Sequence, residues 1–516
     1  MKTASRLSFA IVLVALLQAG TAFATGVGIL TPTPGPKPKI NGPAVYGVRP
    51  GRPFIYRIPC TGLRPMQFSA SGLPASLSLD AETGILKGSA PEAKGEYPII
   101  LKASNQKGAA TRKFTIVVGD QIALTPPMGW NDWYTHYDHV TDAVVRQAAD
   151  AMVASSMADF GYQYVNIDDA WMVKPGASDP SLGGEPRDAK GAILPNRRFP
   201  DMKALTDYIH SRGLRAGIYT SPGPLTCADF VGSYKHESQD ARQFSDWGFD
   251  FLKYDWCSYD SIAPPKDART RQDYEKPYAL MGDLLKMQAR DLVFNLCQYG
   301  MGDVWLWGGA VGGQSWRTGD DLGLVKGTTL PAFYGIGFSN STHADSAGPG
   351  LWNDPDYILI GQIGNANDFS QPAKMTDLTG DEQYSYMSMW SLMASPLFFS
   401  GDMGHLDPFT LNILCNSEVI DIDQDVLGKQ AKIIAKTSGE FILAKPMADG
   451  SLAVGLFNLG DKDSKIRVDW KDLGLSGKRS VRDVWRQKNV GHATGAYETV
   501  VRPHGVALVR LSTTGD

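Results

Sequence analysis

Between residues 120 and 424 the chain repeats one pattern, an apolar run followed by a segment long enough for a helix. This pattern limits the possible folds more than any other feature of the sequence does. The runs are PMGW, YQYVNIDDAW, RAGIYTS, FDFLKYD, LVFNLC, QSWRTGD, GLWNDPD and SPLFFSG. The helical segment before the second run can be capped by Thr141 and terminated by Gly161. Eight strands alternating with helices predict a central (β/α)8 TIM barrel over residues 120–424.

Two β-rich regions flank this predicted barrel. Residues 41–119 contain alternating runs such as PFIYRIP and TRKFTIVVG, separated by Gly, Pro and Asn. Turn signals at intervals of roughly 8–12 residues are typical of a sandwich, and the stretch resembles the immunoglobulin-like modules of secreted bacterial proteins. Residues 425–516 alternate similarly, as in SLAVGLFNLG and GVALVRLS. We therefore expect a multidomain protein: an N-terminal immunoglobulin-like β-sandwich, the barrel, and a C-terminal antiparallel β-sandwich.

The N-terminus predicts export. Lys2 and Arg6 precede the apolar run LSFAIVLVALLQAG, and Ala22-Phe23-Ala24 fits a cleavage site, so residues 1–24 read as a signal peptide. A Pro-rich linker follows at 25–40. We expect a periplasmic or secreted protein that does not insert into the membrane once the signal is removed. The net charge of −4 gives no electrostatic case for nucleic acid as a partner, and the oligomeric state is left open.

The cysteines and histidines do not form a metal-binding pattern. The five cysteines permit disulfides in an exported protein, but an odd number leaves at least one thiol free. There is no CxxC motif or His/Cys cluster with zinc-site spacing. We expect neither a metal nor another cofactor.

Polar and aromatic residues gather where the predicted strands end. In a TIM barrel, the carboxyl ends of the strands form one rim, and active groups lie there. Because strand side chains alternate, Lys253 and Asp255 should point the same way, into the mouth of the barrel. The residues placed on this rim are Trp130, Trp133, Asp168, Asp169, Tyr219, Lys253, Asp255, Cys297, Gln298, Arg317, Asp320, Asp321, Asp354 and Asp356.

The rim contains several carboxylates, one Lys and one Arg, but no His. This composition disfavours a metal hydrolase and a Ser-His-Asp hydrolase. Carboxylates, Lys and Arg suit sugar hydroxyls, aromatic faces suit the apolar side of a pyranose, and two further carboxylates across a glycosidic bond would complete a glycosidase.

Seven sequence blocks carry a family resemblance. LTPPMGWNDW, YVNIDDAWM, FLKYDWC, GQSWRTGDDLG, GPGLWNDPD, SPLFFSGDM and IDIDQDVLGKQ resemble glycoside hydrolase family 27, the α-galactosidases (melibiases) and α-N-acetylgalactosaminidases, in order and spacing. The resemblance implies a retaining exo-glycosidase that removes terminal α-D-galactosyl residues from oligo- or polysaccharides by double displacement. It makes Asp255 the nucleophile and Asp321 the acid/base, with Asp320 as the alternative.

The same resemblance implies the sugar pocket and a disulfide. Asp168 and Asp169 would hold the 4- and 6-hydroxyls, Lys253 the 3- and 4-hydroxyls, and Arg317 with Asp356 the 2- and 3-hydroxyl side. Further lining residues would be Trp130, Trp133, Tyr219, Cys227, Cys297, Gln298 and Tyr299. Cys227 and Cys257 match a disulfide of the family, two buried free thiols being the alternative.

Departures from the family pattern keep other activities open. In the galactosidases of the family, the stretch after the fifth strand resembles Cys-Glu-Trp, whereas this chain has Cys297-Gln298-Tyr299. The resemblance implies that this loop faces the 2-position of the sugar, so a preference for a 2-hydroxyl or a 2-acetamido group stays open. The bulky Gln298 and Tyr299 favour plain galactose. Asp168 and Asp169 are both present, which favours a sugar with a C6 hydroxyl over L-arabinopyranose. The alternatives are an α-N-acetylgalactosaminidase, a β-L-arabinopyranosidase, or an inactive carbohydrate-binding protein, which would need neither Asp255 nor Asp321.

Overall fold

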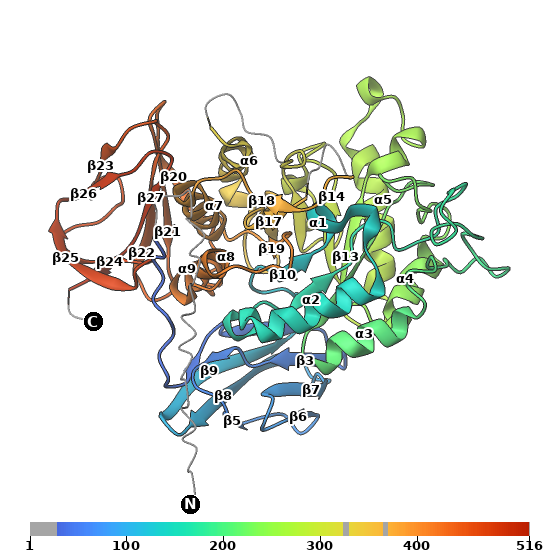
Figure 1. Ribbon diagram of the computed structural model, residues 1–516, viewed down its shortest axis with the longest axis horizontal. Coiled ribbons are helices and arrows are strands. Elements are labelled where there is room, and N and C mark those ends of the chain that lie inside the picture. The colour runs from blue at the N-terminus through green and yellow to red at the C-terminus, as the bar shows by residue number, and fades with distance from the viewer. Residues whose placement is uncertain (1–27, 324–329, 365–369, 515–516) are drawn as a thin grey trace, which may run out of the picture.

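The computed structural model describes residues 28–323, 330–364 and 370–514. Figure 1 shows the barrel at the centre, the N-terminal sandwich in blue below it, and the C-terminal sandwich in red at the left. The predicted multidomain architecture is confirmed. The predicted signal peptide, residues 1–24, lies outside the described residues, as do the first three residues of the predicted linker.

The N-terminal domain is an immunoglobulin-like sandwich. One sheet has the order β2-β9-β8-β5 and the other the order β3-β7-β6. Alternate residues of β8 (Ile99, Leu101 and Ala103) are buried between the sheets, and Tyr56 stacks on Phe114 with ring centroids 4.6 Å apart. The strands are β1 (Lys39–Ile40), β2 (Val45–Val48), β3 (Pro53–Arg57), β4 (Cys60–Thr61), β5 (Gln67–Ser71), β6 (Leu77–Leu79), β7 (Ile85–Ser89), β8 (Gly95–Asn105) and β9 (Gly108–Val118).

The eight predicted barrel runs all become strands of one parallel sheet within the described ranges. Its order is β16-β15-β14-β13-β12-β11-β10-β19, and a parallel bridge between Ile358 and Phe399 closes the ring beyond β16. The strands are β10 (Met128–Asn131), β11 (Tyr164–Asn166), β12 (Arg215–Thr220), β13 (Phe251–Asp255), β14 (Val293–Cys297), β15 (Ser315–Arg317), β16 (Trp352–Asp354) and β19 (Leu397–Phe399). A short hairpin, β17 (Gln362–Ile363) and β18 (Lys374–Met375), lies outside this ring.

Helices connect the barrel strands and cover the sheet. The Thr141 side chain caps α2 as predicted, accepting the N–H of Val144. This helix ends earlier than predicted, at Ala154, and a 3-10 turn then leads to Gly161, whose φ of +111° suits glycine. The helices are α1 (Trp133–His136), α2 (Asp142–Ala154), α3 (Met202–Ser211), α4 (Glu237–Trp247), α5 (Arg271–Lys286), α6 (Ala332–Ser341), α7 (Gly380–Leu392), α8 (Pro408–Leu414) and α9 (Ser417–Asp423).

The C-terminal domain packs against the barrel through α7. This helix starts with a capping box between Thr379 and Glu382 and is buried nearly all round, because the barrel lies on one side and strands β22 and β27 on the other. The main sheet has the order β20-β21-β22-β27-β24-β25, and β23 pairs with β26. The strands are β20 (Lys432–Lys436), β21 (Glu440–Pro446), β22 (Leu452–Asn458), β23 (Ser464–Asp469), β24 (Lys478–Asp483), β25 (Lys488–Thr494), β26 (Ala496–Val501) and β27 (Val506–Thr513).

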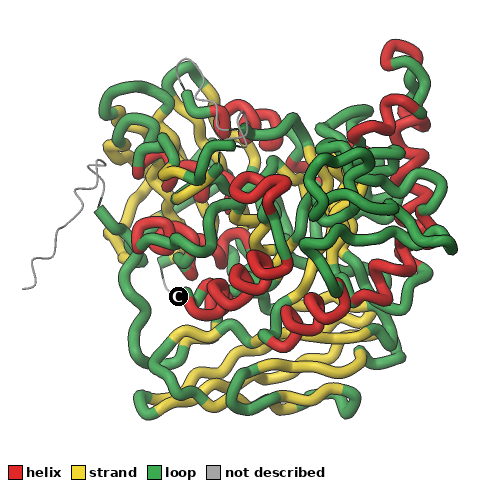
Figure 2. Tube along the Cα trace, turned by 45° about the vertical axis from the view of Figure 1, so that its right-hand side comes forward, coloured by secondary structure: helices red, strands yellow, loops and turns green. Residues whose placement is uncertain are grey.

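The N-terminal sandwich docks on the amino ends of the barrel strands, where Figure 2 shows it as a separate layer of strands. Arg215, the first residue of β12, donates to the carbonyl of Ile55 at 3.0 Å, and its guanidinium lies 4.6 Å from the centre of the Tyr46 ring. Arg49 pairs with Asp291, just before β14. The carboxyl ends of the strands, at the other end of the barrel, remain free of this domain.

Residues 28–38 form an irregular segment that packs against α7 and α8. The amide of Asn412 in α8 donates to the carbonyl of Thr31 at 3.0 Å, and the hydroxyl of Thr31 donates back to the carbonyl of Asn412 at 2.9 Å. The N–H of Leu30 donates to the hydroxyl of Tyr384 in α7 at 3.0 Å. Across the ranges that the structure describes, we find no helix with the length and apolar character required to cross a membrane.

Candidate active site

A cavity opens where the barrel strands end. It encloses about 320 Å³ of space, open solvent at its mouth included. Its lining combines carboxylates, cations and aromatic rings from seven of the barrel strands or the loops that follow them. The residues are Trp133, Tyr134, Asp168, Tyr219, Cys227, Lys253, Asp255, Tyr299, Arg317, Asp321, Asp356 and Tyr357.

Asp255, the last residue of β13, is buried in this cavity and held by two phenols. Tyr219 donates to its Oδ2 at 3.1 Å, and Tyr299 donates to its Oδ1 at 2.7 Å. Burial raises the pKa of Asp255 to about 6, although the ammonium of Lys253 lowers it. The negative charge of Asp321 adds to the rise, so the two carboxyl groups are close enough to interact.

Asp321 lies at the mouth of the cavity, in the loop after β15. Its side chain is 56% exposed, and its Oδ1 lies 3.1 Å from Nη1 of the buried Arg317. Asp320, the alternative acid/base, is exposed and does not line the cavity. Its backbone carbonyl accepts a hydrogen bond from Nη2 of Arg317 at 2.7 Å, which fixes the turn that brings Asp321 to the mouth.

Lys253 and Asp168 form a buried ion pair on the cavity wall. The Lys253 ammonium donates to both oxygens of Asp168, at 3.2 and 2.9 Å. Asn131 and Tyr357 donate to the same carboxylate at 2.8 and 3.0 Å. Burial lowers the pKa of Lys253, but the charge of Asp168 and further neighbours raise it overall, so the amine is a fixed cation. The Lys253 Nζ also lies 5.2 Å from the ring centres of Tyr219 and Tyr357.

A second buried pair, Arg317 and Asp356, lies at another part of the wall. Nη1 of Arg317 is 3.2 Å from Oδ1 of Asp356. The other oxygen of Asp356 accepts the hydroxyl of Tyr134 at 2.9 Å and the N–H of Leu322 at 2.8 Å. The wall therefore offers two charge pairs whose donors and acceptors could bind hydroxyl groups.

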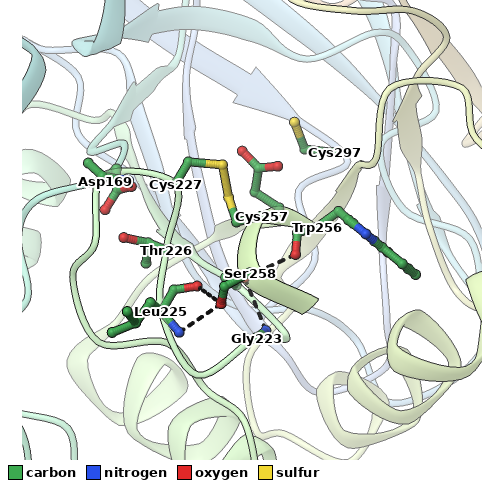
Figure 3. The surroundings of a disulfide bond; sticks show 12 residues. Asp169, Gly223, Leu225, Thr226, Cys227, Trp256, Cys257, Ser258 and Cys297 are labelled. Carbon is green, nitrogen blue, oxygen red and sulfur yellow. Dashed lines mark hydrogen bonds between the residues drawn. A yellow bond between two sulfur atoms is a disulfide. The ribbon is translucent and has the colours of Figure 1, made fainter. Parts of the chain in front are cut away.

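The predicted disulfide between Cys227 and Cys257 is present and forms part of the wall (Figure 3). Cys257 Sγ lies 3.2 Å from the Tyr219 hydroxyl, and Cys227 Sγ lies 3.6 Å from the Tyr299 hydroxyl. The two sulfurs and Asp255 are close enough together to resemble a metal-ligand group, but sulfurs that are bonded to each other offer no thiolate.

Asp169 secures the loop that carries Cys227. One of its oxygens accepts the N–H of Ala228 at 2.9 Å, and the other accepts the N–H of Ala170 at 2.7 Å. Burial raises the pKa of Asp169 to about 7. Figure 3 shows this carboxylate beside Thr226 and Cys227, and Asp169 is not among the residues that line the cavity.

Three more of the predicted site residues lie behind the wall. Trp130 is fully buried, and its indole N–H donates to the carbonyl of Gly401 at 2.9 Å. Cys297 and Gln298 are buried and do not line the cavity. Conversely, Tyr134 and Tyr357 line the cavity although they were not predicted; each follows a predicted strand end within four residues, which is the signal that could have found them.

Comparison with known proteins places this chain in one family. The family model described as "Alpha galactosidase A" matches residues 125–425, and the family model described as "Alpha galactosidase C-terminal beta sandwich domain" matches residues 441–511. The model "Putative Ig domain" matches residues 37–119. The chain belongs to the α-galactosidase family, glycoside hydrolase family 27, with an immunoglobulin-like domain at its N-terminus.

Named relatives cover most of the chain. Alpha-galactosidase 2 of Arabidopsis thaliana is 35% identical over 77% of this chain and 92% of its own length. Alpha-galactosidase A of Cellvibrio japonicus is 34% identical over 78% of this chain and 95% of its own. A Bacteroides fragilis crystal structure, titled a "putative alpha-galactosidase/melibiase", superposes with a TM-score of 0.83 at 35% identity, covering 92% of this chain and 98% of that one.

Proposed function

We propose that the protein is an exported, retaining exo-α-galactosidase that removes terminal α-D-galactosyl residues from oligo- or polysaccharides. Export is suggested by the first 24 residues, and a disulfide suits an oxidising compartment. The choice of D-galactose is supported by the relatives named alpha-galactosidase. The exo mode is supported by the size of the cavity, which suits a single sugar ring.

One observation carries the proposal: Asp255 and Asp321 share one small cavity but have different surroundings. Asp255 is buried and held by phenols, as a nucleophile should be, whereas Asp321 stands at the mouth, where a leaving group would depart. Retaining glycosidases use such a pair with one carboxylate as nucleophile and the other as acid, then base.

In the first step, an oxygen of Asp255 attacks the anomeric carbon while Asp321 gives its proton to the glycosidic oxygen, and the aglycone leaves. In the second step, Asp321 takes a proton from water, the water attacks the same carbon, and Asp255 leaves as a carboxylate. Two inversions return the α-anomer of galactose. In both steps, the Lys253–Asp168 and Arg317–Asp356 pairs would hold the sugar hydroxyls in place.

A panel of aryl glycosides tests the proposal. We expect turnover of p-nitrophenyl α-D-galactopyranoside, with the α-anomer of galactose as the first product seen by NMR. Faster turnover of the N-acetyl-α-galactosaminide or the β-L-arabinopyranoside would assign one of the alternative activities. Binding of galactose without any turnover would leave the inactive carbohydrate-binding protein.

The acid/base assignment has a matched pair of variants. Asp321→Asn should lower kcat/KM for an oligosaccharide by roughly 10²–10⁴-fold, and by less for an aryl galactoside whose leaving group needs little protonation. Asp320→Asn changes a neighbouring, exposed carboxylate and should alter both rates by less than about threefold. The reverse pattern would make Asp320 the acid/base.

A further inference from the structure

Both oxygens of Asp255 accept hydrogen bonds from phenols, and the two phenols come from different parts of the rim. Tyr219 is in β12, next to β13 in the sheet, whereas Tyr299 is in the loop after β14 on the other side. Their donor–acceptor distances to Asp255 are 3.1 and 2.7 Å. The carboxylate thus accepts a hydrogen bond on each of its two oxygens, and the bond from Tyr299 is the shorter one.

The backbone at Tyr299 and Gly300 has an unusual conformation that orients the Tyr299 side chain. Tyr299 has a φ of +63°, in the left-handed region that residues other than Gly seldom adopt. Gly300 follows with a φ of +81°, and a Cβ there would come within 2.5 Å of the carbonyl oxygen of Thr318, so this position needs glycine. Such local strain persists where the surrounding structure enforces it, and functional sites are common places for it.

Two neighbours of Tyr299 lie near its ring and its hydroxyl. The guanidinium of Arg317 lies 5.9 Å from the ring centre, and Sγ of Cys227 lies 3.6 Å from the hydroxyl. The disulfide sulfur carries no proton, so the phenol proton is available to Asp255. The same loop was expected from the sequence to face the 2-position of the sugar.

We propose that Tyr299 is a positioning residue that acts through Asp255: its phenol fixes the orientation of the attacking carboxylate and stabilises its charged form. The inference rests on the proposed function, in which Asp255 is the nucleophile. It goes beyond that function because the phenol is assigned to the carboxylate and not to the sugar.

The test is the pH dependence of Tyr299→Phe, which keeps the ring and removes only the hydroxyl. A hydrogen bond to the charged form lowers a pKa, so its loss should move the acidic limb of kcat/KM up by about one pH unit. On the plateau above this limb, kcat/KM should fall about tenfold, as expected for one charge-assisted hydrogen bond. Tyr357→Phe is the matched control, because it removes a phenol bonded to Asp168; it should reduce activity without moving the limb.

A second substrate separates positioning from sugar recognition. If Tyr299 acts through Asp255, Tyr299→Phe should slow an aryl α-galactoside and its 2-deoxy analogue by the same factor. An unmoved acidic limb, or a loss that disappears with the 2-deoxy substrate, would overturn the inference.

A titration without turnover keeps this inference distinct from the proposed function. The titration of Asp255 can be followed by ¹³C NMR in protein labelled at aspartate, with Asp255→Asn identifying the signal. A higher midpoint in Tyr299→Phe supports the contact even if the wild type hydrolyses no α-galactoside, a result that would sink the proposed function alone. An unchanged midpoint in an active enzyme would overturn the inference alone.

Discussion

Asp255 is a buried carboxyl group whose pKa is raised to about 6, since burial outweighs the opposing charge of Lys253. Its ordinary pKa is 3.8, so the folded protein binds this proton more tightly than the unfolded chain does. Between pH 3.8 and about 6 the contribution of Asp255 to stability therefore falls as the pH rises. Above that range, the ionised group costs on the order of 2–3 kcal/mol.

Asp255→Asn should consequently separate activity from stability. The amide cannot attack the anomeric carbon, so we expect activity to fall by about 10³-fold or more. The same change removes a buried charge, so the melting temperature at pH 7 should rise by a few degrees. Calorimetry and an aryl galactoside assay check the two effects. A variant that keeps its activity would remove Asp255 from the nucleophile role.

The pKa of Asp255 also sets the acid side of the pH profile. Because only the ionised carboxylate can attack, kcat/KM should fall about tenfold per pH unit as the pH drops below about 6. The measurement is kcat/KM for an aryl galactoside between pH 4 and 8. Full activity at pH 4 would contradict the raised pKa.

The disulfide joins two segments that form one side of the cavity. Cys227 lies in the loop after β12, Cys257 follows β13, and the pair is separated by 30 residues in sequence. Replacing both with Ser should cost about 3–4 kcal/mol of stability by the chain-entropy argument. It should also lower kcat, because both phenols that hold Asp255 lie against these sulfurs.

Thermal unfolding and kcat of the double variant are the measurements. The Cys60→Ser variant is the control, since Cys60 is a free cysteine in the N-terminal sandwich, which lies at the opposite end of the barrel from the cavity. We expect it to keep its kcat. A double-Ser variant with unchanged kcat would show that the loop positions its residues without the bond.

The order of the barrel elements and most of the lining could be predicted because alternation and strand ends are local signals. The eight apolar runs give the eight strands, and Lys253 and Asp255 share a face because strand side chains alternate. The particular bridge that closes the ring, between Ile358 and Phe399, could not be predicted, since a single bridge leaves no sequence pattern. The burial of Trp130 and Gln298 behind the cavity wall could not be predicted, because it depends on neighbours that are distant in sequence.

The N-terminal sandwich closes the barrel at the end opposite to the cavity, so it should contribute to stability more than to catalysis. Arg49 contributes several of the contacts: its backbone N–H donates to Asp291 at 2.9 Å and its guanidinium to the carbonyl of Lys286 at 2.8 Å. Arg49→Ala should lower the free energy of unfolding by about 1–3 kcal/mol and leave kcat unchanged.

Lys94→Ala in the same domain is a matched control, because Lys94 pairs with Asp120 at the surface, where both side chains are more than half exposed. Such a pair contributes little, so this variant should unfold like the wild type. Thermal denaturation and kcat of both variants test whether the sandwich contributes to stability and not to catalysis. A fall in kcat for Arg49→Ala would mean that the sandwich influences the distant cavity.

The proposed mechanism depends on a covalent bond between Asp255 and a galactosyl group. The most direct measurement is to trap that bond with a slow fluorinated α-galactosyl fluoride and to locate the added mass by peptide mass spectrometry. We predict one adduct, on Asp255 in the peptide containing FLKYDWC, that turns over in the presence of water. An adduct on any other residue, or no adduct together with inversion at the anomeric carbon, would contradict the account.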